Sequence, residues 1–127
     1  MDTGYINENY GRKRLMEKRT QRFAGETLKM LDTLPVANST RIISYQLGKS
    51  ASSIGANYRE ANGAESRADF SHKIGLVLKE AMETEYWLSI LSSLYPAQER
   101  IKDLLAESSE FVRIFQRVRT TLNKPAP

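Results

Sequence analysis

Residues 50–91 constrain the fold of this chain more than any other segment. They hold a run of small side chains, a short polar break, and then a long helical pattern with apolar residues on more than one side. A helix at a protein surface needs only one apolar stripe, so a helix with two stripes must be covered by several neighbours. The segment therefore predicts packed helices, supplied by this chain or by a partner.

Helix-breaking residues divide the 127-residue chain into four helices within one domain. Pro35 ends the first helix, an Asn-Gly pair at 62–63 ends the second, and Pro96 suits the first position of the fourth. Short links between long helices favour antiparallel neighbours, so we predict an all-α, up-down-up-down four-helix bundle. The expected bundle covers residues 12–123, with helices at about 13–34, 40–61, 66–94 and 96–123, a loose segment at 1–11 and a tail at 124–127.

Polar residues that suit helix caps precede two of these helices. Asn38 or Ser39 is expected to cap the second helix. Ser66, followed three residues later by Asp69, resembles a capping box at the start of the third helix.

The third helix carries two apolar stripes. The main stripe has the four-three spacing of a bundle seam and consists of Phe70, Ile74, Val77, Ala81, Thr84, Leu88 and Leu91. The second stripe consists of Leu76, Trp87, Ile90 and Leu94. Three helices of the same chain cover one side of the third helix, so the second stripe predicts a second subunit and a homo-oligomer. The alternative is a monomer in which this stripe is also covered.

Two carboxylates, Glu80 and Glu83, flank Trp87 on the second stripe. An unpaired buried charge is costly, so they need partners, and Arg59 and Lys49 are the candidates. One interpretation is an ionic network that fixes bundle register or subunit pairing; the other is a set of solvated charges at the rim. The candidate interface and register residues are Arg59, Leu76, Glu80, Glu83, Trp87 and Ile90.

The residue types argue against catalysis. The chain has no cysteine, so a Cys–His pair is not available, and no convincing Ser–His–Asp set can be built around its one histidine, His72. Glu80 and Glu83 have the spacing of paired metal ligands but lack the Glu-x-x-His partners of a di-iron bundle. We therefore expect no enzyme activity, no cofactor and no metal; a carboxylate metal-dependent enzyme is the less favoured alternative. No signal peptide and no run of about 18 apolar residues is visible, which favours a cytoplasmic protein without a membrane partner.

The charge of the chain is mild in total but polarised along the predicted bundle. The whole sequence has 19 basic and 15 acidic residues. One predicted end, made of residues 1–22, 59–73 and 110–127, has thirteen basic and seven acidic residues, whereas the other end has six basic and eight acidic. A basic end suits phosphate backbones, bound with strong salt dependence and little sequence preference. Tyr5 and Tyr10 lie near it in the sequence and suit stacking on bases.

The candidate nucleic-acid-binding residues are the cations at this end of the first and fourth helices. They are Arg12, Lys13, Arg14, Lys18, Arg19, Arg22, Arg113, Arg117 and Arg119. The alternative is a solvated charged end with cations favourably placed near helix C-termini.

Three stretches of the second and third helices resemble a family of small bacterial four-helix bundle proteins. These stretches are residues 53–61 (SIGANYREA), 66–70 (SRADF) and 79–88 (KEAMETEYWL). The family comprises proteins encoded by intervening sequences within 23S rRNA genes, together with the related accessory variability determinant of diversity-generating retroelements. The first and fourth helices match only in pattern and length.

The resemblance implies a ring-shaped homopentamer with a positively charged surface for nucleic acid. In the retroelement branch it implies a reverse transcriptase and its RNA template as partners. It supplies no catalytic residues. We therefore expect a non-enzymatic oligomeric accessory protein that binds RNA or DNA through its basic end. The alternative is a structural protein–protein interaction module that does not bind nucleic acid.

Overall fold

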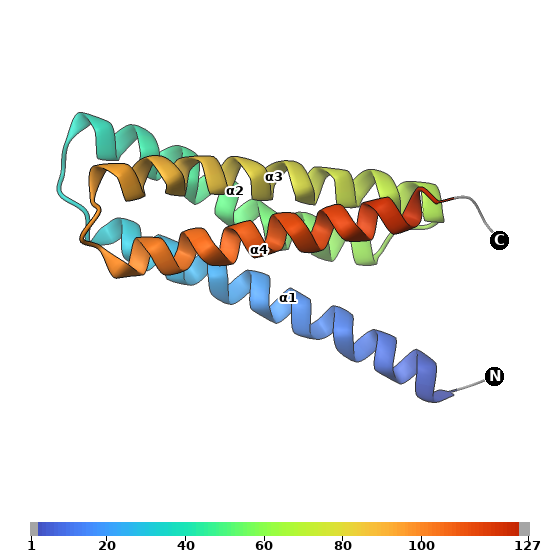
Figure 1. The fold of residues 1–127 in the computed structure, drawn as a ribbon. Helices are drawn as coiled ribbons and strands as arrows, with labels where there is room; N and C mark the ends of the chain where they lie inside the picture. The colour runs from blue at the N-terminus through green and yellow to red at the C-terminus, as the bar shows by residue number, and fades with distance from the viewer. Residues whose placement is uncertain (1–2, 125–127) are drawn as a thin grey trace.

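The computed structural model describes residues 3–124, with side chains from Tyr10 onward, and this part of the chain is four α-helices without a strand. The helices are α1 (Thr3–Asp32), α2 (Asn38–Asn62), α3 (Arg67–Leu94) and α4 (Glu99–Leu122) (Figure 1). The predicted all-α, four-helix architecture is confirmed. Met1 and Asp2 of the expected loose segment and residues 125–127 of the expected tail lie outside the described residues, as does the side chain of Tyr5.

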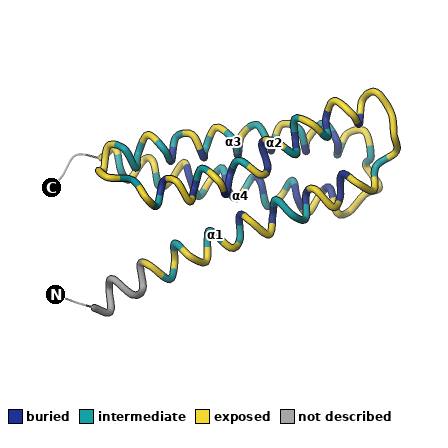
Figure 2. The backbone as a smooth tube through the Cα atoms, turned by 180° about the vertical axis from the view of Figure 1, so that it is seen from behind, coloured by how far each residue is buried: buried dark blue, intermediate teal, exposed yellow. Residues whose placement is uncertain are grey.

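Successive helices run antiparallel, and the two ends of the chain lie at the same end of the bundle (Figure 1). Helix α2 packs between α1 and α3, and α4 packs mainly on α3. The N-terminal half of α1 diverges from the other helices, which leaves the side between α1 and α4 open at that end (Figures 1 and 2). The bundle is therefore closed at the end of the helix-connecting turns 33–37 and 95–98 and splayed at the end of the chain termini.

The core follows the main stripe of α3. Apart from Phe70, which is half-buried at the splayed end, every member of that stripe is buried. The hydroxyl of Thr84 donates to the hydroxyl of Ser50 across 2.9 Å, a buried contact that fixes the register between α2 and α3. The closely packed core of apolar side chains consists of Phe23, Met30, Ile43, Leu47, Ile54, Ile74, Val77, Leu88, Leu91, Ile101, Phe111 and Phe115 with their neighbours.

The first helix begins at Thr3, well before the expected start near Lys13, so the segment expected to be loose is helical from Thr3 onward. The reason is that residues 3–12 contain no proline, and adding a turn to an existing helix costs far less than nucleating one. Gly4 and Gly11 lower the helical stability of this part of α1, each by about 1 kcal/mol, but do not end the helix.

The fourth helix begins at Glu99 rather than at Pro96. Pro96 instead lies in a tight turn that the backbone N–H of Gln98 closes by donating to the carbonyl of Tyr95 across 3.1 Å. Proline has the fixed φ that the second position of such a turn requires, so this turn competes successfully with the first position of a helix.

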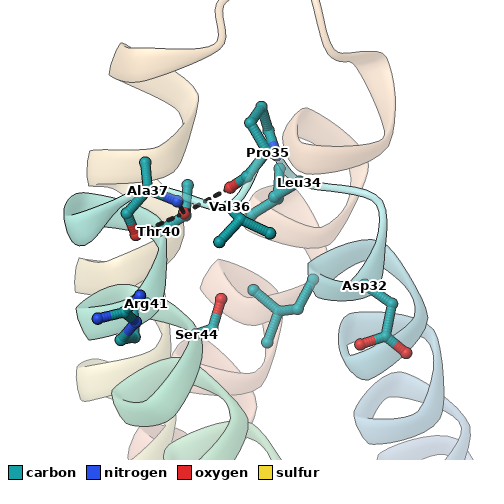
Figure 3. Close-up of a pocket in the computed structure, with 9 residues that line it drawn as sticks. Asp32, Leu34, Pro35, Val36, Ala37, Thr40, Arg41 and Ser44 are labelled. Carbon is teal, nitrogen blue, oxygen red and sulfur yellow. Dashed lines mark hydrogen bonds between the residues drawn. The ribbon is translucent and has the colours of Figure 1, made fainter.

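The turn between α1 and α2 is held by Thr40 rather than by the expected caps Asn38 and Ser39 (Figure 3). The Thr40 hydroxyl accepts from the backbone N–H of Ala37 across 3.0 Å and donates to the carbonyl of Pro35 across 2.6 Å. Ala37 takes the N-cap position and has no side-chain cap. The expected cap of α3 is present, because the Ser66 hydroxyl accepts from the backbone N–H of Asp69 across 3.0 Å.

Helices α1 and α2 approach each other closely at Gly55. A Cβ atom added there would lie 2.9 Å from the hydroxyl oxygen of Thr20 and 3.3 Å from its Cβ. The Thr20 hydroxyl is hydrogen-bonded to the carbonyls of Met16 and Glu17, so it cannot move away without losing these bonds. We expect Gly55→Ala to lower the free energy of unfolding by about 1–3 kcal/mol because the two helices must separate.

Thermal unfolding followed by circular dichroism measures this effect. Gly25→Ala is the matched control, since a Cβ at Gly25 meets no atom within 4 Å, and alanine there should stabilise α1 by up to about 1 kcal/mol. Equal stability of the two variants would contradict the close α1–α2 approach.

Candidate nucleic-acid interface

The antiparallel topology brings together the three segments from which the basic end was predicted. The start of α1, the α2–α3 turn and the end of α4 lie at one end of the bundle (Figure 1). Within it, the structure separates cations that hold helices together from cations that face outward.

Arg19 belongs to the first group. Its guanidinium donates to both carboxylate oxygens of Glu110, at 2.9 and 3.3 Å, and lies 3.8 Å from Glu107 and 4.8 Å from the centre of the Phe111 ring. The hydrogen bond and charge of Arg19 lower the pKa of Glu110 below its ordinary value. Two-pronged pairing of this kind positions the guanidinium firmly. Arg19 therefore joins α1 to α4, and its charge is largely compensated.

Other cations at this end also contact the protein itself. The ring of Phe70 lies 5.8 Å from the ammonium of Lys13. The Arg119 guanidinium lies against Gly75 of α3, 3.1 Å from where a Cβ would be. Arg67 donates to the carbonyl of Leu122 across 3.2 Å and so satisfies the C-terminal end of α4.

The outward-facing cations lie on α1 and α4, the two helices beside the open side of the bundle. Arg14, Lys18 and Arg22 are exposed, and their four-residue spacing places them on one face of α1, about 6 Å apart along its axis. Arg113 and Arg117 are exposed with the same spacing on α4. Lys18, Arg22, Arg113 and Arg117 form no ion pair with any side chain that the structure describes. These five residues are hereafter the outward cations.

An apolar cleft separates the splayed half of α1 from α3 and α4. It has a volume of about 500 Å³ and is lined by Met16, Tyr58, Phe70, Ile74, Ile114, Phe115 and Val118, with Arg12 and Lys13 at its edge. Arg12 is exposed and interacts within the chain. The cleft exists because α1 diverges before its apolar face is fully covered.

The second stripe of α3 remains only partly covered. Leu76 is 39% exposed and Leu94 48% exposed, and Trp87 and Ile90 are half-buried. The Trp87 indole N–H donates to Glu83 across 3.3 Å, and its ring meets that of Tyr86 edge-on at 5.1 Å. Within one subunit, these side chains form an apolar surface beside α2.

Of the two candidate partners for the carboxylates, Lys49 is the one whose charge reaches Glu80. Desolvation, and then the neighbouring charge of Glu83, raise the pKa of Glu80 above its ordinary value, while Lys49 and Lys79 oppose this. Within one subunit, the other candidate partner, Arg59, does not pair with either carboxylate. In the register fixed by Ser50 and Thr84, Arg59 lies further along α2, where it donates to Gln21 of α1 across 2.6 Å.

The described residues contain neither a metal site nor a membrane-spanning helix. No three His, Cys, Asp or Glu side chains between residues 10 and 124 come together to hold a metal ion. Among the same residues, none of the helices has a stretch apolar enough to cross a membrane. A small pocket of about 280 Å³ lies beside the α1–α2 turn at the opposite end from the outward cations (Figure 3).

Sequence patterns did not reveal the polar contacts between α1 and α2. In the sequence Asn62 indicates only a helix break, yet its amide N–H donates to Glu17 across 3.0 Å. The spacing of Glu17 and Gln21, one turn apart on α1, was the available signal, since both face the end of α2.

The fold and the outward cations define a small all-α bundle protein with one basic, splayed end. Residues 12–117 match the family described as 23S rRNA-intervening sequence protein, and the chain belongs to this family. The chain is also similar to a protein of unknown function from the S23 ribosomal protein family of Bacteroides thetaiotaomicron, solved at 1.70 Å. The two share 35% identity with a TM-score of 0.71, over 81% of this chain and 96% of that one. No curated protein sequence matches this chain.

Proposed function

We propose that this protein is a non-enzymatic, oligomeric accessory protein that binds RNA or DNA through the basic end of its bundle. The observation that carries the proposal is the set of outward cations. They lie on two adjacent helices at one end, and four of them lack an ion-pair partner among the described side chains. Surface cations of this kind attract phosphate backbones and release counterions when they bind.

Oligomer formation is the second part of the proposal, and the exposed second stripe of α3 supports it. Apolar side chains that line one helix face are typical of a subunit interface. A homopentameric ring, as the family resemblance implies, would repeat the basic end around one rim and multiply its positive potential. Where a reverse transcriptase is the partner, this rim would meet its RNA.

The charge-reversal variant Arg14→Glu, Lys18→Glu, Arg22→Glu tests the nucleic-acid part. We expect it to weaken binding of a fluorescent RNA hairpin by at least about tenfold at low salt, and to reduce the salt slope by about three, one for each lost phosphate contact. Fluorescence anisotropy over a salt series measures both quantities.

The matched control reverses three exposed cations away from the basic end, in the variant Arg41→Glu, Lys79→Glu, Lys102→Glu. It changes the net charge by the same amount, so it should retain a steep salt slope. Equal loss of binding in both variants would mean that total charge, rather than the face of α1, governs binding.

A purely structural interaction module is the second candidate function. The exposed stripe of α3 favours it, because that stripe suits a protein partner as well as a second copy. Assembly without any salt-dependent RNA or DNA binding would support this function instead.

A further inference from the structure

A polar pocket lies between α1 and the end of α2, at the same end as the outward cations. It has a volume of about 370 Å³, within the range of about 300–1,000 Å³ typical of small-molecule sites. Its lining combines one aromatic ring, Tyr10, with three cations, Lys13, Arg14 and Arg59, and one carboxylate, Glu17. This combination differs from Arg113 and Arg117, which are exposed cations on one face of α4.

Contacts within the pocket hold its polar groups in place. Arg59 donates to Gln21 across 2.6 Å, and Arg14 lies 3.4 Å from the Tyr10 hydroxyl, to which it donates. Glu17 accepts from the amide of Asn62, whose oxygen is buried without a hydrogen-bond partner among the described residues. An amide turned the other way would place that oxygen against the Glu17 carboxylate, so the observed orientation is the favourable one. The cations are therefore arranged around a fixed carboxylate–amide pair.

The Tyr10 side chain is the exposed aromatic part of the pocket, although its hydroxyl accepts from Arg14. Its exposed fraction is 63%, and it lies within helix α1. An exposed aromatic ring beside several cations is the arrangement by which proteins hold single-stranded nucleic acid, because a base stacks on the ring while cations contact the adjoining phosphates. A paired base inside a duplex cannot reach such a ring without being unstacked.

We propose that this pocket binds one unpaired nucleotide of an RNA strand, with its base on Tyr10 and its phosphate among Lys13, Arg14 and Arg59. The inference rests on the proposed nucleic-acid binding and makes it more specific. The other four outward cations follow the backbone of any nucleic acid, whereas this pocket, which includes Arg14, selects a strand that offers an unpaired base. The carboxylate of Glu17 adds an acceptor for the donor groups on a base edge.

The test compares an unstructured ten-nucleotide RNA with a blunt RNA duplex of the same sequence, by fluorescence anisotropy at low salt. We expect the unmodified protein to bind the single strand more tightly than the duplex. Tyr10→Ala should weaken binding of the single strand by about fivefold or more, the usual effect of losing one stacked base, and leave the duplex unchanged. Tyr10→Phe should keep the affinity, since the ring is retained.

Tyr45→Ala is the control, because Tyr45 is equally exposed, at 69%, but lies on α2 far from the pocket. Tighter binding of the duplex, or the same result for Tyr10→Ala and Tyr45→Ala, would contradict nucleotide binding in the pocket. Nucleic-acid binding by the basic end would still stand if the charge-reversal variant bound RNA more weakly. If neither RNA bound in a salt-dependent way, the proposed function itself would fail. Circular dichroism checks that each variant is folded. We expect folding to be retained, because Tyr10 and Tyr45 are both exposed.

Discussion

A Trp87→Glu variant is expected to be monomeric in solution under conditions in which the unmodified protein is an oligomer. Trp87 lies in the middle of the second stripe of α3, half-buried, with its indole fixed by Glu83 and its ring against Tyr86. Aromatic residues at the centre of an interface commonly contribute about 2 kcal/mol or more to association. A carboxylate there, beside Glu80 and Glu83, would also place like charges at a desolvated surface. Size-exclusion chromatography with light scattering measures the change.

Leu76→Glu, about three turns from Trp87 on the same stripe, should have the same effect. Ala106→Glu is the control, since Ala106 is an exposed apolar residue on α4, and this variant should keep the size of the unmodified protein. A monomeric unmodified protein would refute the assembly proposal directly.

A Phe111→Ala variant is expected to lose about 3–5 kcal/mol of unfolding free energy, the usual cost of emptying a fully buried aromatic site. Phe111 has no exposed surface, meets Phe23 of α1 edge-on at 5.2 Å, and lies beneath the guanidinium of Arg19. Because α1 and α4 touch at few other places, removing this ring should loosen α1 from the bundle as well as empty the core. Denaturant unfolding at fixed protein concentration measures the loss.

Phe70→Ala removes the same side chain from the splayed end and serves as the comparison. Phe70 is half-buried beside the apolar cleft, so the loss there should be smaller than half of that at Phe111. Similar losses at the two positions would contradict a bundle that is tightly closed at one end and open at the other.

The spacing of apolar residues was enough to predict the helical architecture and the core of α3. The main stripe of α3 is buried, as its spacing predicts, because an apolar stripe along a helix packs against the core. Its buried members are Ile74, Val77, Ala81, Thr84, Leu88 and Leu91. Helix ends were harder to predict. Pro96 suits both a turn and a helix start, and Thr40 rather than Asn38 holds the preceding turn, since these choices depend on local backbone geometry.

The candidate site was predictable as an end of the bundle but not as a set of contacts. Topology and charge counts placed the cations together, yet the sequence does not distinguish Arg19, which is paired with Glu110, from Lys18 beside it. The difference comes from which side of α1 faces α4, and that depends on how α1 diverges. The position of Arg59 was missed for the same reason, since its partner Gln21 is distant in sequence and close only in the fold.

The salt dependence of RNA binding by the unmodified protein tests the central claim most directly. If the outward cations contact phosphates, the logarithm of the association constant should fall with the logarithm of salt concentration with a slope of about −3 or steeper. The measurement is an anisotropy titration of an RNA hairpin containing a single-stranded loop, at several salt concentrations. Binding with a slope near zero, or no binding at low salt, would contradict a nucleic-acid interface at the basic end.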